Sequence, residues 1–281
     1  MKKAIWAGIC FSLLYSLFVV IQQKFVRTSL HPVQINAFSN AFALILVLLF
    51  ARVFSPHEFK VKHKKGLKYA LVSGLFAAVF ADLFVLYGLQ ISSATNASIL
   101  LKLTIILTFA FSMIAFKQKI TKYKILSIFI ALAGTVLIVF DFEHGYTINL
   151  GDLLFLGAVL SYSLANIANQ KASKYLSTIQ ILIFRSLSAT VILIPISLLF
   201  FPIATFPSIG LITFNGIVIA TGCFLVTTII RNSNASFFEI ISSLIPVFTI
   251  ILSYFFFKDL PTAYQIIGGL LIIGSIPIFL K

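Results

Sequence analysis

The chain has 281 residues, of which 60% are hydrophobic and only 10% are charged, and its mean hydropathy is +1.10. Soluble domains carry about 25% charged residues, so this composition excludes an ordinary soluble protein and predicts a polytopic membrane protein. The formal charge of +14 does not indicate nucleic-acid binding. The basic residues lie mostly in short gaps between apolar runs, and no basic face accompanies a soluble fold.

A helix needs about 20 mostly apolar residues to cross a bilayer. On that rule the sequence predicts an all-α integral membrane protein with ten transmembrane helices. The first apolar run continues to Ile21, beyond the 7–15 residues or so of a signal-peptide core, so we interpret it as a retained span. The predicted helices cover 3–22, 33–53, 68–89, 94–116, 124–140, 151–170, 178–201, 209–230, 235–257 and 263–280.

The basic residues between these runs are unevenly distributed, and most of them fall on the side that holds both ends of the chain. Loops rich in Lys and Arg stay in the cytoplasm, so we expect a multi-pass protein of the cytoplasmic (inner) cell membrane with both termini cytoplasmic. The same residues are expected to contact lipid headgroups. The cytoplasmic gaps include Lys2, Lys3, the stretch 60–68 and Lys281, and the opposite gaps keep Lys24, Arg27 and Lys258.

The two halves of the chain resemble each other, which predicts a first five-helix repeat at 1–145 and a second at 146–281. Residues 15–17 (Tyr-Ser-Leu) recur at 162–164, and Gly134 is matched with Gly274 at a nearly constant shift. Because five is odd, the second copy must cross the membrane in the opposite direction. Inverted repeats of this kind are typical of secondary transporters, whose sites lie between the repeats near mid-membrane.

Two matched helices, 94–116 and 235–257, carry polar residues at every fourth position, and residues four apart share a helix face. Charged groups at membrane depth are costly and usually face a protein interior or a watery cavity. The two stripes therefore predict a solute site near the pseudo-twofold axis. Their polar members are Ser98 and Lys102 in the first helix, matched with Glu239 and Ser243 in the second.

Four charged residues inside the predicted spans suggest pairings. Asp82 and Lys102 each lie ten residues from Ser92, so we expect antiparallel helices to place them at one depth as an ion pair, either structural or functional. Lys102→Ala should then destabilise more than the double change Asp82→Asn with Lys102→Met, since an unpaired buried charge costs about 3–5 kcal/mol. Glu239 with Arg185 or Arg231 is a candidate inner gate, and Glu239 is also the candidate for proton coupling.

Further features concern the lining and shape of the bundle. Tyr162 and Asn166 share one helix face and are candidate lining residues. Pro246 is expected to kink its helix; Ile105 stands at the matching place in the first repeat, so the two repeats should bend differently. Small residues at four-residue spacing in the first helix predict close helix packing. They are Ala4, Gly8, Ser12 and Ser16.

The chain resembles the EamA-type branch of the drug/metabolite transporter superfamily over nearly its whole length. The residues that carry this resemblance are Gly151-Asp152, Arg185, Ala235 with Pro246, Phe257-Lys258-Asp259, Thr262, Gly268 and Gly274. The first half departs from the pattern, with Ile105 in place of the usual proline and Gln118 in place of the usual glutamate. The resemblance implies ten helices in two halves and a cargo among amino acids, nucleotide-linked metabolites, sugars or drugs.

We therefore expect a secondary transporter of a small organic solute, an amino acid or related metabolite, that works by alternating access and is proton-coupled or an exchanger. A drug or nucleotide-type metabolite transporter of the same fold is the first alternative. An intramembrane lipid-acting enzyme is the second, but no His lies at membrane depth and no Ser has an evident base. A non-transporting scaffold or channel is the third. We expect no catalytic residue, cofactor or metal, a solute and lipid as partners but no nucleic acid, and an oligomeric state left open.

Overall fold

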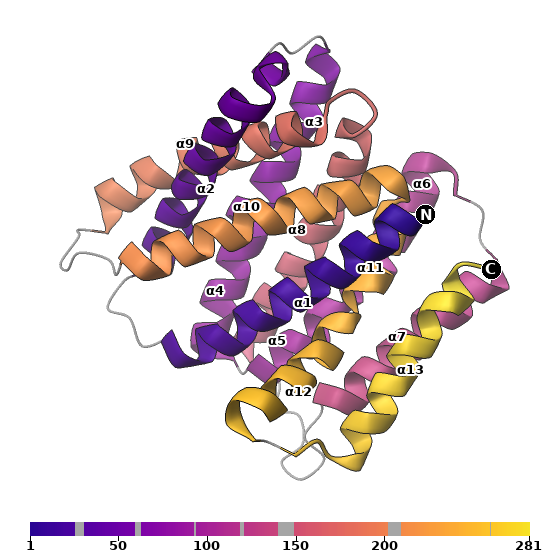
Figure 1. The fold of residues 1–281 in the computed structure, drawn as a ribbon. Helices are drawn as coiled ribbons and strands as arrows, with labels where there is room; N and C mark the ends of the chain where they lie inside the picture. Colours follow the sequence, from indigo (N-terminus) through magenta and orange to yellow (C-terminus); the bar gives the residue numbers. More distant parts are fainter. Residues whose placement is uncertain are drawn as a thin grey trace.

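The structure is a computed structural model that describes residues 1–25, 31–59, 63–92, 94–118, 121–139, 149–201, 209–258 and 260–281. Within these ranges it consists of helices without any strand, packed as one bundle (Figure 1). The predicted all-α class is therefore confirmed. Both ends of the chain lie at the same side of the bundle, at the right of Figure 1.

Each of the ten predicted apolar segments is helical. Among the described residues, seven helices are long and apolar enough to cross a membrane and two shorter ones are apolar, so the count of ten spans stays a prediction. The α-helices are α1 Lys2–Phe25, α2 Pro32–Phe54, α3 Lys64–Gly74, α4 Asp82–Ile91, α5 Ala94–Leu100, α6 Thr104–Phe116, α7 Lys122–Val139, α8 Leu150–Ala172, α9 Thr178–Phe200, α10 Ile209–Asn232, α11 Ala235–Ser242, α12 Leu244–Phe257 and α13 Ala263–Phe279. The other elements are the 3₁₀ turns η1 Pro56–Phe59 and η3 Leu101–Leu103 and the π segment η2 Leu75–Ala81.

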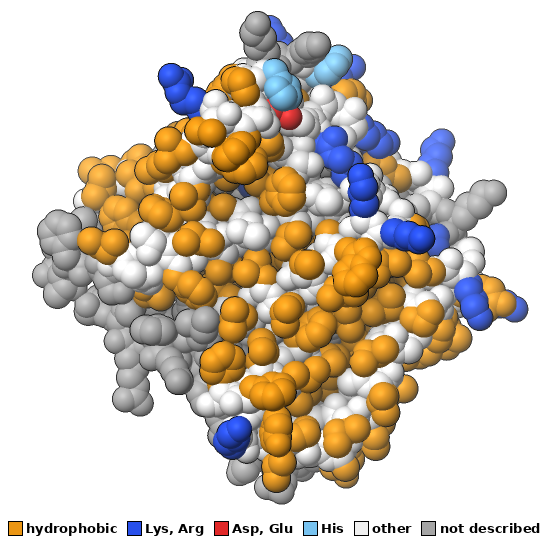
Figure 2. Space-filling view, in the orientation of Figure 1, with side chains coloured by type: hydrophobic (Ala, Val, Ile, Leu, Met, Phe, Trp, Pro, Cys, Tyr) orange, Lys and Arg blue, Asp and Glu red, His pale blue; other side chains and the backbone are white. Residues whose placement is uncertain are grey.

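The outside of the bundle is apolar. Leu199 is 77% exposed and Phe200 70% exposed at the end of α9, and Figure 2 shows hydrophobic side chains over most of one face. Soluble monomers rarely expose contiguous apolar patches larger than a few hundred Å², whereas lipid tails cover such a surface favourably. The protein is therefore a multi-pass membrane protein. Lys and Arg gather along the margin of this face on the side of the chain ends (Figures 1 and 2).

The two halves of the chain interleave through antiparallel and parallel helix pairs. Helix α7 of the first half packs along α13 of the second, and the Ser127 hydroxyl donates to the Ser275 carbonyl at 2.8 Å. A Cβ on Gly134 would lie 2.6 Å from the Gly268 carbonyl oxygen, and one on Gly268 would lie 2.5 Å from the Gly134 carbonyl oxygen. The glycines that meet across this helix pair are thus Gly134 and Gly268, whereas Gly274, which the sequence matches with Gly134 as a repeat position, has open space around it.

Helix α1 lies against α11 and α12 as the small-residue spacing predicted. A Cβ on Gly8 would lie 2.3 Å from the Ile241 side chain, so only glycine permits this approach. The serines have a second role. Ser12 donates to the Ile241 carbonyl at 3.1 Å and Ser16 to the Ile245 carbonyl at 2.8 Å. Because both pairs are separated by the same number of residues, α1 runs parallel to this helix pair.

Helix α8 begins at a polar cluster that joins it to the α4–α5 connection. Asn149 and Asp152 form a capping box, which satisfies amides that a helix start leaves free. The buried Asp152 carboxylate also accepts from the Ser92 hydroxyl at 2.6 Å and from the Asn96 amide at 3.0 Å. Asp152 thus holds α4, α5 and α8 together at one end of the bundle.

Helix α2 begins at His31. Its Nδ1 accepts from the Val33 amide at 3.3 Å, and its ring stacks on Phe201 with the ring centres 3.8 Å apart. Burial lowers the pKa of His31, because desolvation disfavours the charged imidazolium. The neutral form suits this capping role, since only an unprotonated Nδ1 can accept.

Candidate functional site

The helix that carries Glu239 is interrupted at its centre. Helix α11 ends at Ser242, α12 begins at Leu244, and Pro246 follows two residues later. Proline has no amide hydrogen, so the carbonyl of Ser242, four residues before it, receives no intrahelical donor from this position. Lys102 fills the place, with its Nζ 3.4 Å from the Ser242 carbonyl oxygen.

The matching helix of the first repeat is interrupted at the same point. The 3₁₀ turn Leu101–Leu103 separates α5 from α6 and contains Lys102, which the sequence matches with Ser243. Thr104 donates to the Leu101 carbonyl at 2.7 Å beside this turn. The expectation that the two repeats bend differently, because Ile105 stands in place of a proline, stays a prediction. Both helices break, although only the second contains the proline.

A third irregularity precedes Asp82. The π segment Leu75–Ala81 leads directly into α4, and Asp82 is the first residue after it. At the start of the segment, a Cβ on Gly74 would lie 2.4 Å from the Arg185 carbonyl oxygen, so this helix crosses α9 closely. Single π turns inside helices are frequent at functional sites, and here the turn sets the direction of a buried carboxylate.

We call the first group of polar residues the Glu239 centre; it comprises Glu239, Lys102, Thr104, Thr108 and Asn166. The Glu239 side chain is 5% exposed. Its carboxylate accepts from the Asn166 amide at 2.6 Å and from the Thr108 hydroxyl at 3.4 Å, and it lies 2.8 Å from the Thr104 hydroxyl. Lys102 interacts with it electrostatically. Helices α6, α8 and α11 thus converge on one carboxylate between the two halves.

The second group, the Asp82 centre, comprises Asp82, Tyr162, Arg185 and Tyr15. The Tyr162 hydroxyl donates to the Asp82 carboxylate at 2.5 Å, and Arg185 interacts electrostatically with both residues. Asp82, Tyr162 and Arg185 are half-buried and Tyr15 is 37% exposed, so this centre is more open than the first. The buried Nε of Arg185 has no hydrogen-bond partner among the described residues.

Helix α8 links the two centres, because Tyr162 faces Asp82 and Asn166, one turn later, faces Glu239. The predicted common face of Tyr162 and Asn166 thus serves two neighbouring carboxylates.

The two predicted charge pairings are not formed. Asp82 and Lys102 make no ion pair; Asp82 turns to Tyr162 and Arg185, and Lys102 to the Ser242 carbonyl. Glu239 pairs with neither arginine, because Arg185 belongs to the Asp82 centre and Arg231 donates to the Leu176 carbonyl. An inner gate of Glu239 and an arginine, which would break and re-form during transport, stays a prediction.

The remaining candidates are placed as follows. Ser243 is fully buried at the helix break, where its hydroxyl donates to the Glu239 carbonyl at 3.3 Å. Ser98 lies in α5, and its side chain falls outside the part of the chain that the structure describes.

Three partners of Glu239 and Lys102 were missed from the sequence. Thr104 and Thr108 lie one turn apart in an apolar helix, and this spacing indicates a second polar face. The sequence analysis considered only the face of Ser98 and Lys102. Pro246 predicts a free carbonyl at Ser242, because proline provides no amide hydrogen for the carbonyl four residues before it.

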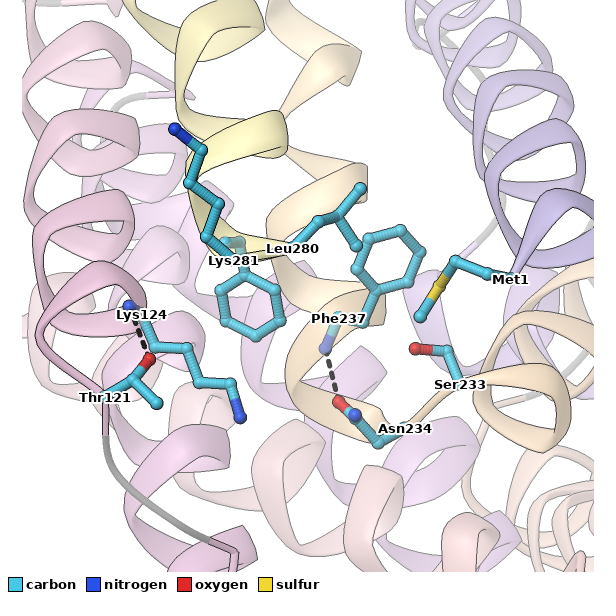
Figure 3. A pocket seen from close by; sticks show the side chains of 9 residues that line it. Met1, Thr121, Lys124, Ser233, Asn234, Phe237, Leu280 and Lys281 are labelled. Atoms are coloured by element: carbon cyan, nitrogen blue, oxygen red, sulfur yellow. Dashed lines mark hydrogen bonds between the residues drawn. The ribbon is translucent and has the colours of Figure 1, made fainter.

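A surface pocket of about 260 Å³ lies at the end of the bundle beside both chain termini. Figure 3 shows Met1, Thr121, Lys124, Asn234 and Lys281 around it, and Phe237 is the lining residue nearest to Glu239 in sequence. None of the candidate residues lines this pocket. The Glu239 and Asp82 centres, which hold most of the candidate residues, are therefore taken as the candidate site.

The chain resembles known proteins over its whole length. The model of the EamA-like transporter family matches residues 2–140 and, a second time, residues 149–280. A comparison with curated protein sequences finds no match. Among 29 matching chains of solved structures, one, described only as "Crystal structure of protein", superposes with a TM-score of 0.81 at 17% sequence identity and covers 99% of this chain and 96% of its own. At that identity it shows a shared fold and nothing about cargo.

Proposed function

Since the chain belongs to the EamA-like transporter family, we propose that it carries a small zwitterionic solute, an amino acid or related metabolite, across the cytoplasmic membrane by alternating access. The proposed site lies between the repeats, which we take as 1–145 and 146–281, at the Glu239 and Asp82 centres. The proposal rests on one observation above all: two carboxylates and a guanidinium lie inside the bundle with neutral donors around them.

The chemistry of the two centres favours a zwitterion. A solute ammonium group can be held by Glu239 or Asp82, and a solute carboxylate by Arg185, whose planar guanidinium suits carboxylate geometry. The Arg185 Nε still has a hydrogen to donate. A nucleotide-linked metabolite would call for more cationic groups than Arg185 and Lys102, and a simple cationic drug would leave Arg185 unused.

The contacts of Thr104 bear on whether Glu239 can carry a coupled proton. Thr104 Oγ1 lies 2.7 Å from the Leu101 carbonyl and 2.8 Å from the Glu239 carboxylate, but a hydroxyl carries only one hydrogen. A proton on Glu239 would serve the second contact while Thr104 donates to Leu101. The two coupling modes to distinguish are proton-coupled transport and proton-independent exchange. A pH gradient should drive uptake in the first mode and not in the second.

The test is uptake of a radiolabelled mixture of L-amino acids into proteoliposomes that contain the purified protein. We expect saturable uptake that falls about tenfold or more in Glu239→Gln, because loss of a charged hydrogen-bond partner costs about 1.5–3 kcal/mol. Glu143→Gln, the same substitution between predicted spans, is the matched control and should leave uptake unchanged. Uptake of quaternary ammonium drugs or nucleotide sugars in place of amino acids would overturn the cargo class. Absence of any gradient-driven flux would favour the scaffold alternative.

A further inference from the structure

Lys102 stands between two acceptors on the same helix. Its Nζ lies 3.4 Å from the Ser242 carbonyl, and it interacts electrostatically with the Glu239 carboxylate. Residues three apart lie on one helix face, so both acceptors face Lys102 about one turn apart along α11. We take both as alternative acceptors of its ammonium group, which sits on a flexible four-carbon stem.

The Ser242 carbonyl is available because of Pro246. In an unbroken helix, this oxygen would accept the amide hydrogen of residue 246, which proline lacks. The neighbouring carbonyls at the break contact side-chain hydroxyls of α1, since Ser12 donates to the Ile241 carbonyl at 3.1 Å and the Ser16 hydroxyl oxygen lies 2.8 Å from the Ile245 carbonyl oxygen. Lys102 therefore holds the acceptor that the proline leaves open, at the point where α11 meets α12.

The Glu239 carboxylate, in contrast, has only neutral hydrogen-bond donors in the part of the chain that the structure describes. They are Thr104, Thr108 and Asn166. An ionised carboxylate at membrane depth requires a cation nearby, and removing the partner of a buried charge is strongly destabilising. Lys102 is placed to supply that cation whenever no other cation does.

We propose that Lys102 is an internal counter-cation that competes with the solute's ammonium group for Glu239. This inference rests on the proposed function. When solute binds, its ammonium takes the carboxylate and Lys102 moves to the Ser242 carbonyl; when solute leaves, Lys102 returns to Glu239. The empty carrier then changes conformation while Lys102 neutralises the charge of the Glu239 carboxylate. Ser242 lies at the break between α11 and α12. The contact of Lys102 with this break therefore depends on whether solute is bound.

The proposal separates two modes of transport that share one binding site. Exchange of internal for external solute uses only the loaded carrier, whereas net transport also requires the empty carrier to return. Without Lys102, the empty carrier would have to change conformation with an uncompensated buried carboxylate. Loss of the lysine should therefore impair net flux far more than exchange.

The experiment compares both modes in proteoliposomes with the radiolabelled L-amino acid mixture. Lys102→Met should retain exchange within about twofold but lose net uptake about tenfold or more, as expected for an unpaired buried charge. Lys102→Arg, which keeps the cation, should restore net uptake in part. Lys122→Met, the same substitution at an exposed lysine, is the control. Equal loss of both modes, or no loss of either, would overturn the proposal.

Pro246→Ala provides a second test that does not depend on the folding of the Lys102 variants. Alanine restores an amide hydrogen to the Ser242 carbonyl, so Lys102 stays on Glu239 and the solute must displace it. We expect KM to rise several-fold in exchange and net uptake alike, and Pro277→Ala in α13 should leave KM unchanged. An unaltered KM in Pro246→Ala would contradict the partner exchange. Failure of wild-type protein to exchange amino acids would instead refute the proposed function and would be recognised before any variant is compared.

Discussion

Asp82 shows how this bundle holds a carboxylate away from its ends. The Tyr162 hydroxyl donates to it at 2.5 Å, and Arg185 lies in its electrostatic neighbourhood. A carboxylate has several acceptor sites, and only one of them is filled by Tyr162. The group is therefore held in place by one side chain and keeps the capacity to accept further donors, as a solute ammonium group would provide.

Replacing Tyr162 by Phe tests this anchoring. The variant removes one hydroxyl while keeping the ring, so we expect the free energy of unfolding to fall by about 1.5 kcal/mol, within the range for a hydrogen bond to a charged group. The measurement is SDS-induced unfolding in mixed micelles. Tyr15→Phe is the matched control, because Tyr15 belongs to the same centre but makes no hydrogen bond to Asp82. Equal destabilisation by the two variants would show that the Tyr162 hydroxyl is not the anchor.

The erroneous pairing of Asp82 with Lys102 shows where sequence reasoning fails at this scale. Equal distances from Ser92 place two residues opposite each other only if both helices are regular. Here a π segment ends just before Asp82 and a 3₁₀ turn contains Lys102. A π turn holds more residues than an α turn and a 3₁₀ turn holds fewer, so each side chain is rotated away from the face that an α period predicts. No residue type in these segments signals either irregularity.

At the scale of elements, the sequence predicted where helices exist and which faces are polar. Apolar runs of the length of a bilayer and a four-residue period of polar groups depend only on helix geometry; the runs are helical, and Glu239 and Ser243 of the second stripe are buried. Glu239 was therefore placed correctly at an interior face. Its partners were not, because which helix packs against which is decided by contacts between residues far apart in the chain.

Helices α7 and α13 make such a contact where they cross. We expect one added methyl group at this crossing to lower the stability of the protein. Gly134→Ala or Gly268→Ala would place a Cβ about 2.6 or 2.5 Å from the opposite carbonyl oxygen, and overpacking typically costs about 1–3 kcal/mol. We expect each variant to unfold at a lower temperature in detergent. Gly274→Ala, on the same helix but in open space, should be neutral or stabilising by up to about 1 kcal/mol, since alanine favours helix. A destabilised Gly274→Ala with intact Gly134→Ala and Gly268→Ala would show that the close approach of the two helices does not lie at Gly134 and Gly268.

At the scale of the whole molecule, the halves form one body rather than two domains side by side. Helix α1 packs on α10, α11 and α12, α2 on α9 and α10, α3 and α4 on α8, and α7 on α13. Every one of these contacts joins the first half to the second. The polar centres consequently belong to neither repeat alone, since Glu239 from the second half accepts from Thr104 and Thr108 of the first.

The orientation of this body in the membrane is the last prediction. Lys and Arg gather on the margin beside both chain ends (Figure 2), and such an excess remains cytoplasmic. In a Cys10→Ser, Cys223→Ser background, Lys281→Cys should resist a membrane-impermeant maleimide in intact cells and react after lysis. Leu260→Cys, 79% exposed before the other end of α13, should react in intact cells. The reverse pattern would place the termini outside the cell, and both repeats would then cross the membrane in the direction opposite to the one we propose. Labelling of both sites in intact cells would mean that α13 does not cross the membrane.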